Sequence, residues 1–253
     1  MAKKLKEYYN QEYLLDLSDK ILSVTDKFDR DKFLELTIPD IDDLEFTPRQ
    51  ELVANALDES LSIDYVNTLD VFYQILGPEL SGNSGAFSEG RWLRPIGKYV
   101  EDYGAEYFTQ STDFSKELTK RFTGEYCMRP ILEKYPKKTL DLLKIWSTDE
   151  NERVRRLASE CMRIRLPWAK RMDIALKYFD DFLEVLDNLK NDSDKYIQKS
   201  VANNLNDLYK EDPEKFYYIV EKWETSDITK QTKWIIKHGS RTKDKELSNE
   251  GWN

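Results

Sequence analysis

Three stretches in the second half of the chain resemble one another, and no other feature constrains the fold as strongly. They begin at Leu142, Glu184 and Phe216, and each contains an apolar helix, a short acidic turn and a second amphipathic helix. Repeats of roughly 40 residues are typical of helix pairs that bury their apolar faces against neighbouring pairs. Such stacking produces a curved array whose inner helices share one extended surface. A generic helical bundle with accidental similarity is the alternative interpretation.

Helical periodicity continues through the rest of the chain. Only 9 glycines and 8 prolines punctuate the 253 residues, and the apolar residues recur at three-four spacing rather than in strict alternation. We therefore predict an all-α fold, a HEAT-like helical-repeat solenoid. We expect one domain over residues 1–253, with a helical cap at about 1–90, a repeat core at about 91–241 and a short polar tail at 242–253. The predicted helices cover residues 18–33, 48–61, 65–76, 93–103, 105–109, 114–129, 138–146, 151–162, 167–187, 195–207, 213–224 and 228–238, with a glycine-rich loop at 77–90.

Charge is distributed unevenly along the chain. The protein has 39 Lys and Arg against 48 Asp and Glu, and residues 35–80 hold eleven acidic residues with Arg49 as their one cation. Residues 152–172 and 230–245 are locally basic, which in an acidic chain indicates a phosphate-binding surface. We therefore predict that the concave face of the solenoid binds the phosphates of a nucleic acid, with solvated helix faces as the alternative. The cations of the first basic run are Arg153, Arg155, Arg156, Arg163, Arg165, Lys170 and Arg171.

The cysteines and the N-terminal segment indicate where the protein works. Cys127 and Cys161 lie in apolar helical patterns, which is typical of reduced thiols rather than of a secreted disulfide framework. The first residues contain no continuous apolar stretch, and no later one approaches the length needed to cross a bilayer. We expect a cytoplasmic monomer that does not bind membranes.

The sequence lacks the patterns of the common catalytic sites. It contains no glycine-rich phosphate loop, no zinc-ligand spacing and no Ser/His/Asp triad, and His238 is the one histidine. We therefore expect no metal and no cofactor. Because His238 follows Lys237 and precedes Gly239 near a helix end, we expect it to cap that helix or to lie near a phosphate.

Carboxylates set among cations or amides are the remaining candidates for chemistry. They recur on the second helices of predicted repeats, and equivalent helices of a solenoid line the same groove. Structural salt bridges are the alternative, because such pairs are common on helices. The three groups are Glu125 with Arg121 and Arg129, Glu160 with Arg156 and Arg163, and Asp207 with Asn203 and Asn204.

The segment Arg165-Leu166-Pro167-Trp168 differs from its surroundings. A proline in a first helical turn fixes the start of a helix, whose free N–H groups can bind an anion. Trp168 would emerge beside those groups, where it could stack on a base or a sugar. Packing of Trp168 between helix pairs is an equally good interpretation. Trp146, Trp223 and Trp234 have the pattern of core residues.

At these positions the sequence resembles the AlkC-type DNA glycosylases, HEAT-like enzymes that remove alkylated bases. Residues 122–130 (FTGEYCMRP) are similar to the family's FTSEFAIRP, and residues 154–160 (VRRLASE) and 165–169 (RLPWA) match its VRRLASEG and RLPWA. Residues 201–207 (VANNLND) and 234–238 (WIIKH) are similar to its later helices. The resemblance extends from about residue 61 to residue 241.

The resemblance implies a monofunctional glycosylase that excises 3-methyladenine and 3-methylcytosine from duplex DNA without deep base flipping. A non-catalytic module that binds damaged DNA and a protein-interaction scaffold are the alternatives. Cys161, Ile164 and Gly239 depart from the family pattern, and we expect no C-terminal immunoglobulin-like domain. By the resemblance the catalytic candidates are Glu160, which is favoured to approach the sugar, Glu125 and Asp207, and the DNA-binding candidates are Trp168, Arg155, Arg156, Arg163, Arg165, Lys170, Arg171, Lys237 and Arg241.

Overall fold

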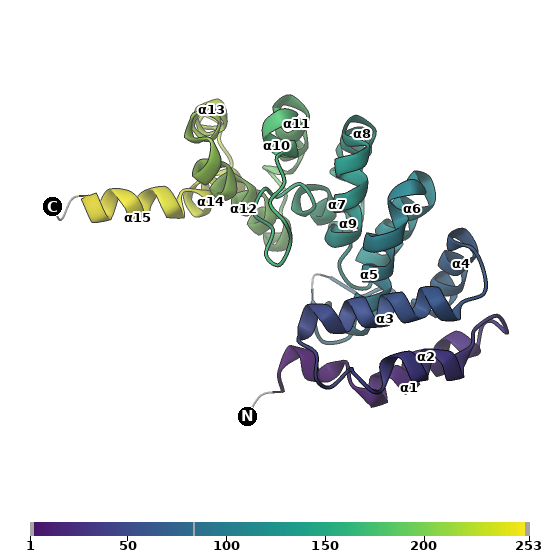
Figure 1. Ribbon diagram of the computed structural model, residues 1–253. Helices are drawn as coiled ribbons and strands as arrows, with labels where there is room; N and C mark the ends of the chain where they lie inside the picture. Colours follow the sequence, from purple (N-terminus) through teal and green to yellow (C-terminus); the bar gives the residue numbers. More distant parts are fainter. Residues whose placement is uncertain (1–2, 83, 251–253) are drawn as a thin grey trace. The chain divides into compact units, whose positions relative to one another are not determined.

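The computed structural model describes residues 3–82 and 84–250, and it divides the chain into two compact units, Met1–Ile131 and Leu132–Asn253 (Figure 1). Regular structure in the described residues is helical, apart from an isolated antiparallel bridge between Phe28 and Leu61. None of the described helices combines the length and the apolar composition that a membrane span requires. The all-α prediction is confirmed, whereas the single-domain arrangement stays a prediction.

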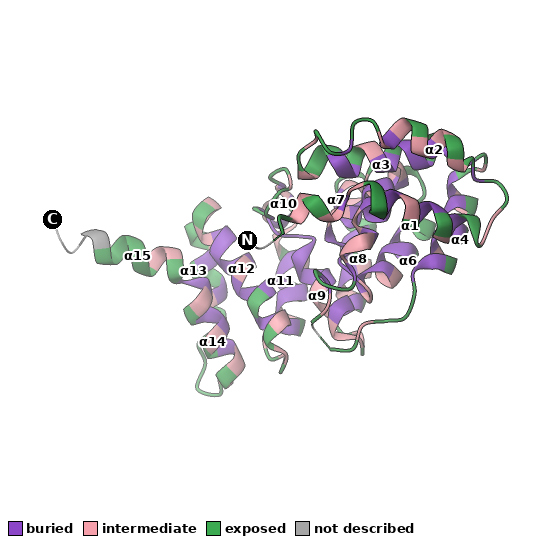
Figure 2. Ribbon diagram, turned by 90° about the horizontal axis from the view of Figure 1, so that it is seen from below, coloured by how far each residue is buried: buried purple, intermediate pink, exposed green. Residues whose placement is uncertain are grey.

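The first unit is built around an apolar core to which each of its α-helices contributes (buried residues are purple in Figure 2). Leu14, Phe33, Leu57, Phe72 and Phe114 are fully buried there. The helix from 46 to 60 packs against those at 30–37 and 94–103. The elements are η1 (Leu5–Tyr8), α1 (Gln11–Leu22), α2 (Arg30–Thr37), α3 (Phe46–Ser60), α4 (Tyr65–Ile75), η2 (Arg91–Leu93), α5 (Arg94–Tyr103), η3 (Gly104–Glu106) and α6 (Phe108–Thr119), followed by α7 (Glu125–Lys134), which continues into the second unit.

The second unit contains the predicted repeats. Its helices are α8 (Pro136–Trp146), α9 (Glu152–Glu160), α10 (Ile174–Lys177), α11 (Phe179–Leu189), α12 (Lys195–Glu211), α13 (Pro213–Trp223), α14 (Lys230–Gly239) and α15 (Arg241–Glu250). In Figure 1, α8, α11 and α13 lie along one edge of this unit, with α9, α12 and α14 beneath them. Helix α12 packs against both α9 and α14, so the second helices of successive pairs lie side by side. The repeat prediction is confirmed.

The acidic turns start the inner helices as their composition suggests. The side chain of Asn151 accepts hydrogen bonds from the N–H groups of Arg153 and Val154 at the start of α9. Asp194 does the same for Tyr196 at the start of α12. These caps satisfy N–H groups that have no partner within the helix. Recurrent caps therefore place α9 and α12 at equivalent positions of their repeats.

Several predicted helix boundaries are wrong. The helix predicted at 18–33 is divided between α1 and α2, because Phe28 is extended in its bridge with Leu61 and Asp29 caps α2. The helix predicted at 114–129 is divided between α6 and α7, with residues 120–124 between them. Residues 105–109 belong partly to η3 and partly to α6, and the predicted polar tail contains α15. Apolar spacing on both sides of each break fits one helical pattern, so periodicity alone misses it.

Burial follows the predictions for the thiols and for two of the three core tryptophans. Both cysteines are buried free thiols. Trp146 and Trp223 are buried. Trp234 is only half-buried and stacks on His238, with ring centroids 4.8 Å apart. Its prediction as a core residue is therefore wrong.

Candidate active site

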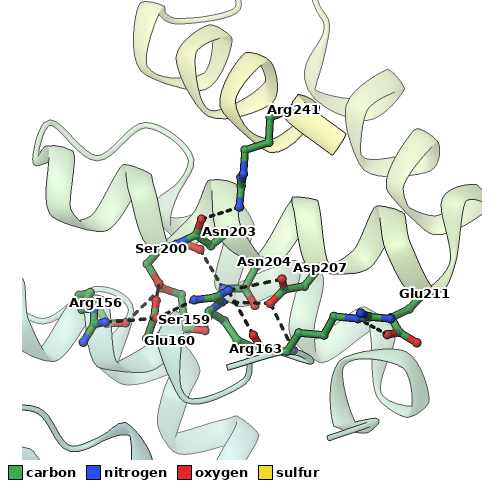
Figure 3. A network of polar contacts seen from close by, with 11 residues as sticks. Arg156, Ser159, Glu160, Arg163, Ser200, Asn203, Asn204, Asp207, Glu211 and Arg241 are labelled. Atoms are coloured by element: carbon green, nitrogen blue, oxygen red, sulfur yellow. Dashed lines mark hydrogen bonds and ion pairs between the residues drawn. The ribbon is translucent and has the colours of Figure 1, made fainter. Parts of the chain in front are cut away.

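The last turn of α9 and the middle of α12 bring ionisable side chains together inside the second unit (Figure 3). Glu160 ends α9 and is only 5 % exposed. Its Oε1 accepts contacts from Arg163 Nη1 at 3.0 Å and Arg156 Nη2 at 3.2 Å, and its Oε2 accepts a hydrogen bond from Ser200 Oγ at 2.6 Å. Burial opposes ionisation, but the two guanidinium groups and the hydroxyl outweigh it and lower the pKa of Glu160.

Arg163 connects Glu160 to a second carboxylate, that of Asp207 on α12. Its Nε donates to Asp207 Oδ2 at 3.0 Å, and its Nη2 lies 3.4 Å from Oδ1. The backbone N–H of Arg165 also approaches Oδ2, at 3.3 Å. Burial raises the pKa of Asp207 against the opposing effect of Arg163. One guanidinium thus holds two buried carboxylates whose pKa values move in opposite directions.

Hydroxyl and amide groups support this pair from α9 and α12. Ser159 Oγ and Ser200 Oγ share a hydrogen bond of 2.7 Å. The side-chain amide of Asn204 donates to the backbone oxygens of Ser159 and Ser200, at 2.9 and 3.1 Å. Since both serines and Asn204 are buried, these bonds fix how far α9 and α12 can slide along each other. They hold Ser200 beside Glu160.

Trp168 lies on a closed loop that leaves this network. The N–H of Met172 donates to the oxygen of Ile164 at 3.1 Å and closes the loop. Pro167 and Trp168 occupy a turn, and the next helix begins only at Ile174, so the predicted helix start at Pro167 is wrong. Trp168 has a φ of 61° and is 71 % exposed, and packing between helix pairs is therefore excluded. A non-glycine residue in the left-handed region is uncommon and marks functional turns.

Exposed arginines anchor the same loop to the end of α12. Arg165 Nε donates to Glu211 Oε1 at 2.5 Å, and Arg171 Nη2 donates to Glu211 Oε2 at 2.7 Å. Arg171 also pairs with Asp173. The loop is therefore held at both of its ends by one carboxylate of α12. The side chains of Arg165 and Arg171 remain about half exposed, which leaves their outer edges open to a further anion.

The other predicted DNA-binding cations have different surroundings. Arg155 bonds to Asp192 at 2.7 Å and to the backbone oxygens of Asp149 and Glu150, so it joins the acidic turns of two repeats. Arg163 is buried in the network, and Arg156 combines its contact to Glu160 with the ring of Tyr196, 4.7 Å from its centroid. The exposed members of the predicted set are Arg165, Trp168, Lys170, Arg171, Lys237 and Arg241.

Glu125 belongs to the first unit. It is the first residue of α7, is buried, and has Arg129 one turn further along the same helix. Arg121 precedes α7 and donates to the backbone oxygen of Gly77 and to Glu117, at 2.7 and 2.9 Å. The prediction that Arg121, Glu125 and Arg129 share one helical face is therefore wrong for Arg121.

Comparison with known proteins places this geometry in a family. The model of a DNA alkylation repair enzyme family matches residues 111–242, which is about half of the chain and includes the whole network. The chain belongs to this family. It is 35 % identical over 239 residues to YhaZ, an uncharacterized protein of Bacillus subtilis (strain 168). The match covers 94 % of this chain and 64 % of that protein.

A solved relative shares both the family and the fold. It is the Pseudomonas fluorescens alkylpurine DNA glycosylase AlkC bound to DNA containing an abasic site analog, with a TM-score of 0.83 and 32 % identity. The match covers 95 % of this chain and 65 % of that one, so the chain spans a little under two thirds of both relatives. The resemblance to AlkC-type members of the DNA alkylation repair family is confirmed.

Sequence reasoning within this family pattern missed the two serines of the network, Ser159 and Ser200, and also Glu211, which anchors the adjoining loop. Ser200 falls opposite Leu157 when the repeats are compared, and a hydroxyl at an apolar repeat position indicates a buried hydrogen bond. That signal was present in the sequence. Ser159 and Glu211 had no comparable signal, because their partners lie 41 and 46 residues away along the chain.

Proposed function

We propose that the protein is a monofunctional DNA glycosylase that hydrolyses the N-glycosidic bond of cationic alkylated bases, 3-methyladenine and 3-methylcytosine, in duplex DNA. The observation that carries the proposal is the pair of buried carboxylates, Glu160 and Asp207, that share the guanidinium of Arg163. Membership of the DNA alkylation repair family and the likeness to AlkC support it. The exposed Trp168 on the adjoining loop supplies a surface for the damaged nucleotide.

Alkylation makes this reaction less demanding than excision of a normal base. The alkylated base carries a positive charge and leaves as a neutral molecule when the bond to the sugar C1′ breaks. Water then forms the new C1′–O bond, and its proton passes to a carboxylate. The site must therefore stabilise an electron-poor sugar and orient one water molecule, and carboxylates in fixed positions can do both. Neither step requires an acid group for the departing base.

The contacts of the two carboxylates suggest a division of roles. Both oxygens of Glu160 accept short contacts, from two arginines and from Ser200, which suits a fixed negative charge. Among the described residues, the one polar contact of Asp207 Oδ1 is that of 3.4 Å to Arg163. Together with its raised pKa, this makes Asp207 our candidate for the base that accepts the proton of water. Glu125 remains the third candidate, proposed from its family position.

The DNA contacts follow from exposure. Trp168 would stack on the damaged nucleotide at the protein surface, without a deep pocket, while Arg165, Lys170 and Arg171 of the same loop would contact phosphates. Arg155, Arg156 and Arg163 would act through their neighbours, because their guanidinium groups bond to protein atoms. Their role would be to hold the groove in shape.

The decisive experiment measures release of free 3-methyladenine and 3-methylcytosine from methylated duplex DNA. We expect wild type and Glu221→Gln, a change at an exposed carboxylate of α13, to release both bases at equal rates. Asp207→Asn should reduce the rate about 100-fold or more, in the range of a lost general base. Glu160→Gln should also reduce it.

Two results of this experiment would contradict the proposal or the assigned roles. If wild type binds the methylated duplex but releases no base, the glycosylase proposal is overturned and the non-catalytic module takes its place. If Asp207→Asn retains full activity while Glu160→Gln or Glu125→Gln does not, the role of base passes to the residue whose loss abolishes release.

A further inference from the structure

Side chains one helical turn apart on α12, those of Lys195, Lys199 and Asn203, form a row beside α14 and α15. Lys195 Nζ lies 3.9 Å from the ring centroid of Trp234. One turn further along each helix come Lys199 of α12 and His238 of α14, whose ring stacks on that of Trp234. After another turn, Asn203 Oδ1 accepts a hydrogen bond of 3.0 Å from Arg241 Nη2 (Figure 3). We call this row the α12–α14 ladder; its members are Lys195, Lys199, Asn203, Trp234, His238 and Arg241.

The ladder is a surface feature with aromatic and cationic character. Lys195, Lys199 and Arg241 are exposed, and His238 and Trp234 are half-buried. The two rings stack 4.8 Å apart and nearly parallel, with 11° between their planes. Such stacks present a rigid flat surface, and cations beside them attract phosphates. Core packing would have buried Trp234, as the sequence pattern suggested.

Its cations are not neutralised by the protein. Lys195 donates to the amide oxygen of Gln198 at 2.7 Å, and neither it nor Lys199 forms an ion pair with a carboxylate in the part of the chain that the structure describes. Arg241 donates to Asn203 and to the backbone oxygen of His238, both neutral acceptors. By contrast, arginines of the active-site network bind carboxylates. Three uncompensated charges along one row are unusual in a chain of net charge −9.

The ladder has the length and the direction of a short piece of nucleic-acid strand. Eight residues separate Lys195 from Asn203, or about 12 Å of helix, which corresponds to about three phosphates of one strand. The row ends beside the network around Glu160 and Asp207, because Asn203 bonds to Arg241 and the next residue, Asn204, is part of that network. A strand bound along it would lead toward Glu160 and Asp207.

We propose that the α12–α14 ladder binds the phosphodiester backbone of one DNA strand, with Lys199 and His238 together holding one phosphate. The inference rests on the proposed function, in that DNA is the ligand. It adds a separate contact surface formed by α12, α14 and α15, in which Lys195 and Lys199 have no role in the proposed function. Lys237 is also exposed on α14, but it lines a surface cavity with Lys233 and Lys243 and is not part of the ladder.

Protonation of His238 gives the phosphate site a measurable signature. Burial, followed by the charges of Arg241, Lys199 and Lys195, lowers the pKa of His238 below its usual value of 6.5 in the free protein. A bound phosphate favours the protonated ring and raises that pKa. At pH values between the pKa of His238 in the free protein and its higher pKa in the complex, DNA binding is accompanied by uptake of one proton. The affinity for DNA therefore falls as pH rises through this window and then levels off. His238 is the one histidine, which makes the assignment unambiguous.

The test uses the full chain and an undamaged, fluorescently labelled duplex, with binding followed by anisotropy. Lys199→Ala should weaken binding severalfold at 100 mM salt and reduce the slope of log K against log salt by about 0.9, the value for one lost phosphate contact. His238→Gln should remove the pH dependence between pH 5.5 and 7.5 while leaving binding at pH 8 within about twofold of wild type. Lys222→Ala, at an exposed lysine of α13 outside both basic runs, is the matched control and should change the slope little.

Several outcomes would overturn the proposal. Equal losses from Lys199→Ala and Lys222→Ala would show a general charge effect rather than a site. An unchanged salt slope in Lys199→Ala, or a pH dependence that survives in His238→Gln, would also contradict it. Since the probe is undamaged, the result is independent of excision. If the protein releases alkylated bases but its DNA binding does not depend on the ladder, the ladder proposal alone is rejected. If DNA binding depends on the ladder but no base is released, the glycosylase proposal alone is rejected.

Discussion

Arg163 is bonded on both sides of its guanidinium, to Glu160 through Nη1 and to Asp207 through Nε and Nη2. The nitrogens of a planar, forked guanidinium point in different directions, which lets this one cation reach both carboxylates. Both acids are buried, so each would lose its compensating charge if the fork were removed. The ionisation of the two catalytic candidates is therefore coupled through a residue that need not contact the substrate.

Arg163→Lys tests this coupling. A single ammonium nitrogen lacks the separate donors with which the guanidinium reaches Glu160 and Asp207, and we expect the free energy of unfolding to fall by about 2–5 kcal/mol in urea denaturation. The pKa of the less well paired acid should rise, so the acidic limb of the rate of base release should move toward neutral pH. Arg165→Lys is the control, because its side chain is half exposed and its pair with Glu211 should contribute less than about 1 kcal/mol. An unshifted pH profile would contradict the positioning role of Arg163.

The sequence predicted part of this site and could not predict the rest. Arg156, Glu160 and Arg163 are three or four residues apart on or just beyond one helix, and local spacing is enough to bring them together. Asp207 is 44 residues from Arg163, and their contact depends on how α9 packs on α12. Repeat periodicity indicated that these helices are neighbours, but it did not fix which turns face each other. Trp168 likewise depends on a loop whose left-handed residue no helical pattern reveals.

At the scale of helices, close packing of α14 on α12 positions the ladder. Gly239, the last residue of α14, lies against Leu205 and Ala202 of α12. A Cβ atom at this position would lie 2.8 Å from Leu205 Cβ, which is closer than real side chains approach. The predicted helix ended at residue 238, just before Gly239. The structure shows instead that α14 runs through Gly239 and that its missing side chain admits the neighbouring helix.

Gly239→Ala should therefore destabilise the protein, although alanine favours helices by about 1 kcal/mol. We expect a net loss of about 1–3 kcal/mol in the free energy of unfolding, because α14 must move away from Leu205. Thermal and urea unfolding would measure it, with Lys233→Ala on an exposed site of the same helix expected within about 0.5 kcal/mol of wild type. A more stable Gly239→Ala protein would show that the contact has room to relax.

Over the whole molecule, the two units differ in charge. Residues 1–131 contain 25 acidic and 15 basic residues, a net charge of −10, and residues 132–253 contain 23 and 24, a net charge of +1. The one cation of the acidic stretch, Arg49, is buried and donates to four backbone oxygens, so it does little to offset the surrounding carboxylates. Net charge alone would argue against a nucleic-acid partner. The separation of charge between units removes that objection for the second unit.

Binding of undamaged duplex DNA should accordingly be strongly salt-dependent in spite of the acidic composition. Three phosphate contacts would give a slope of about −2.7, or roughly a fortyfold loss of affinity between 50 and 200 mM salt. Anisotropy titrations at four salt concentrations would measure the slope. A slope near zero would favour the protein-interaction scaffold, since contacts between largely neutral surfaces release few counterions.

The stacking of α9, α12 and α14 also has an evolutionary consequence. The carboxylate network crosses the junction between α9 and α12, whereas the ladder crosses the next junction, between α12 and α14 and α15. In a repeat array each unit depends mainly on its immediate neighbours, so substitutions at one junction leave the other largely intact. Lineages could thus lose excision and keep DNA binding, or alter strand affinity and keep the chemistry. Helix α12 alone belongs to both junctions, and its two faces should be the slowest part of the second unit to diverge.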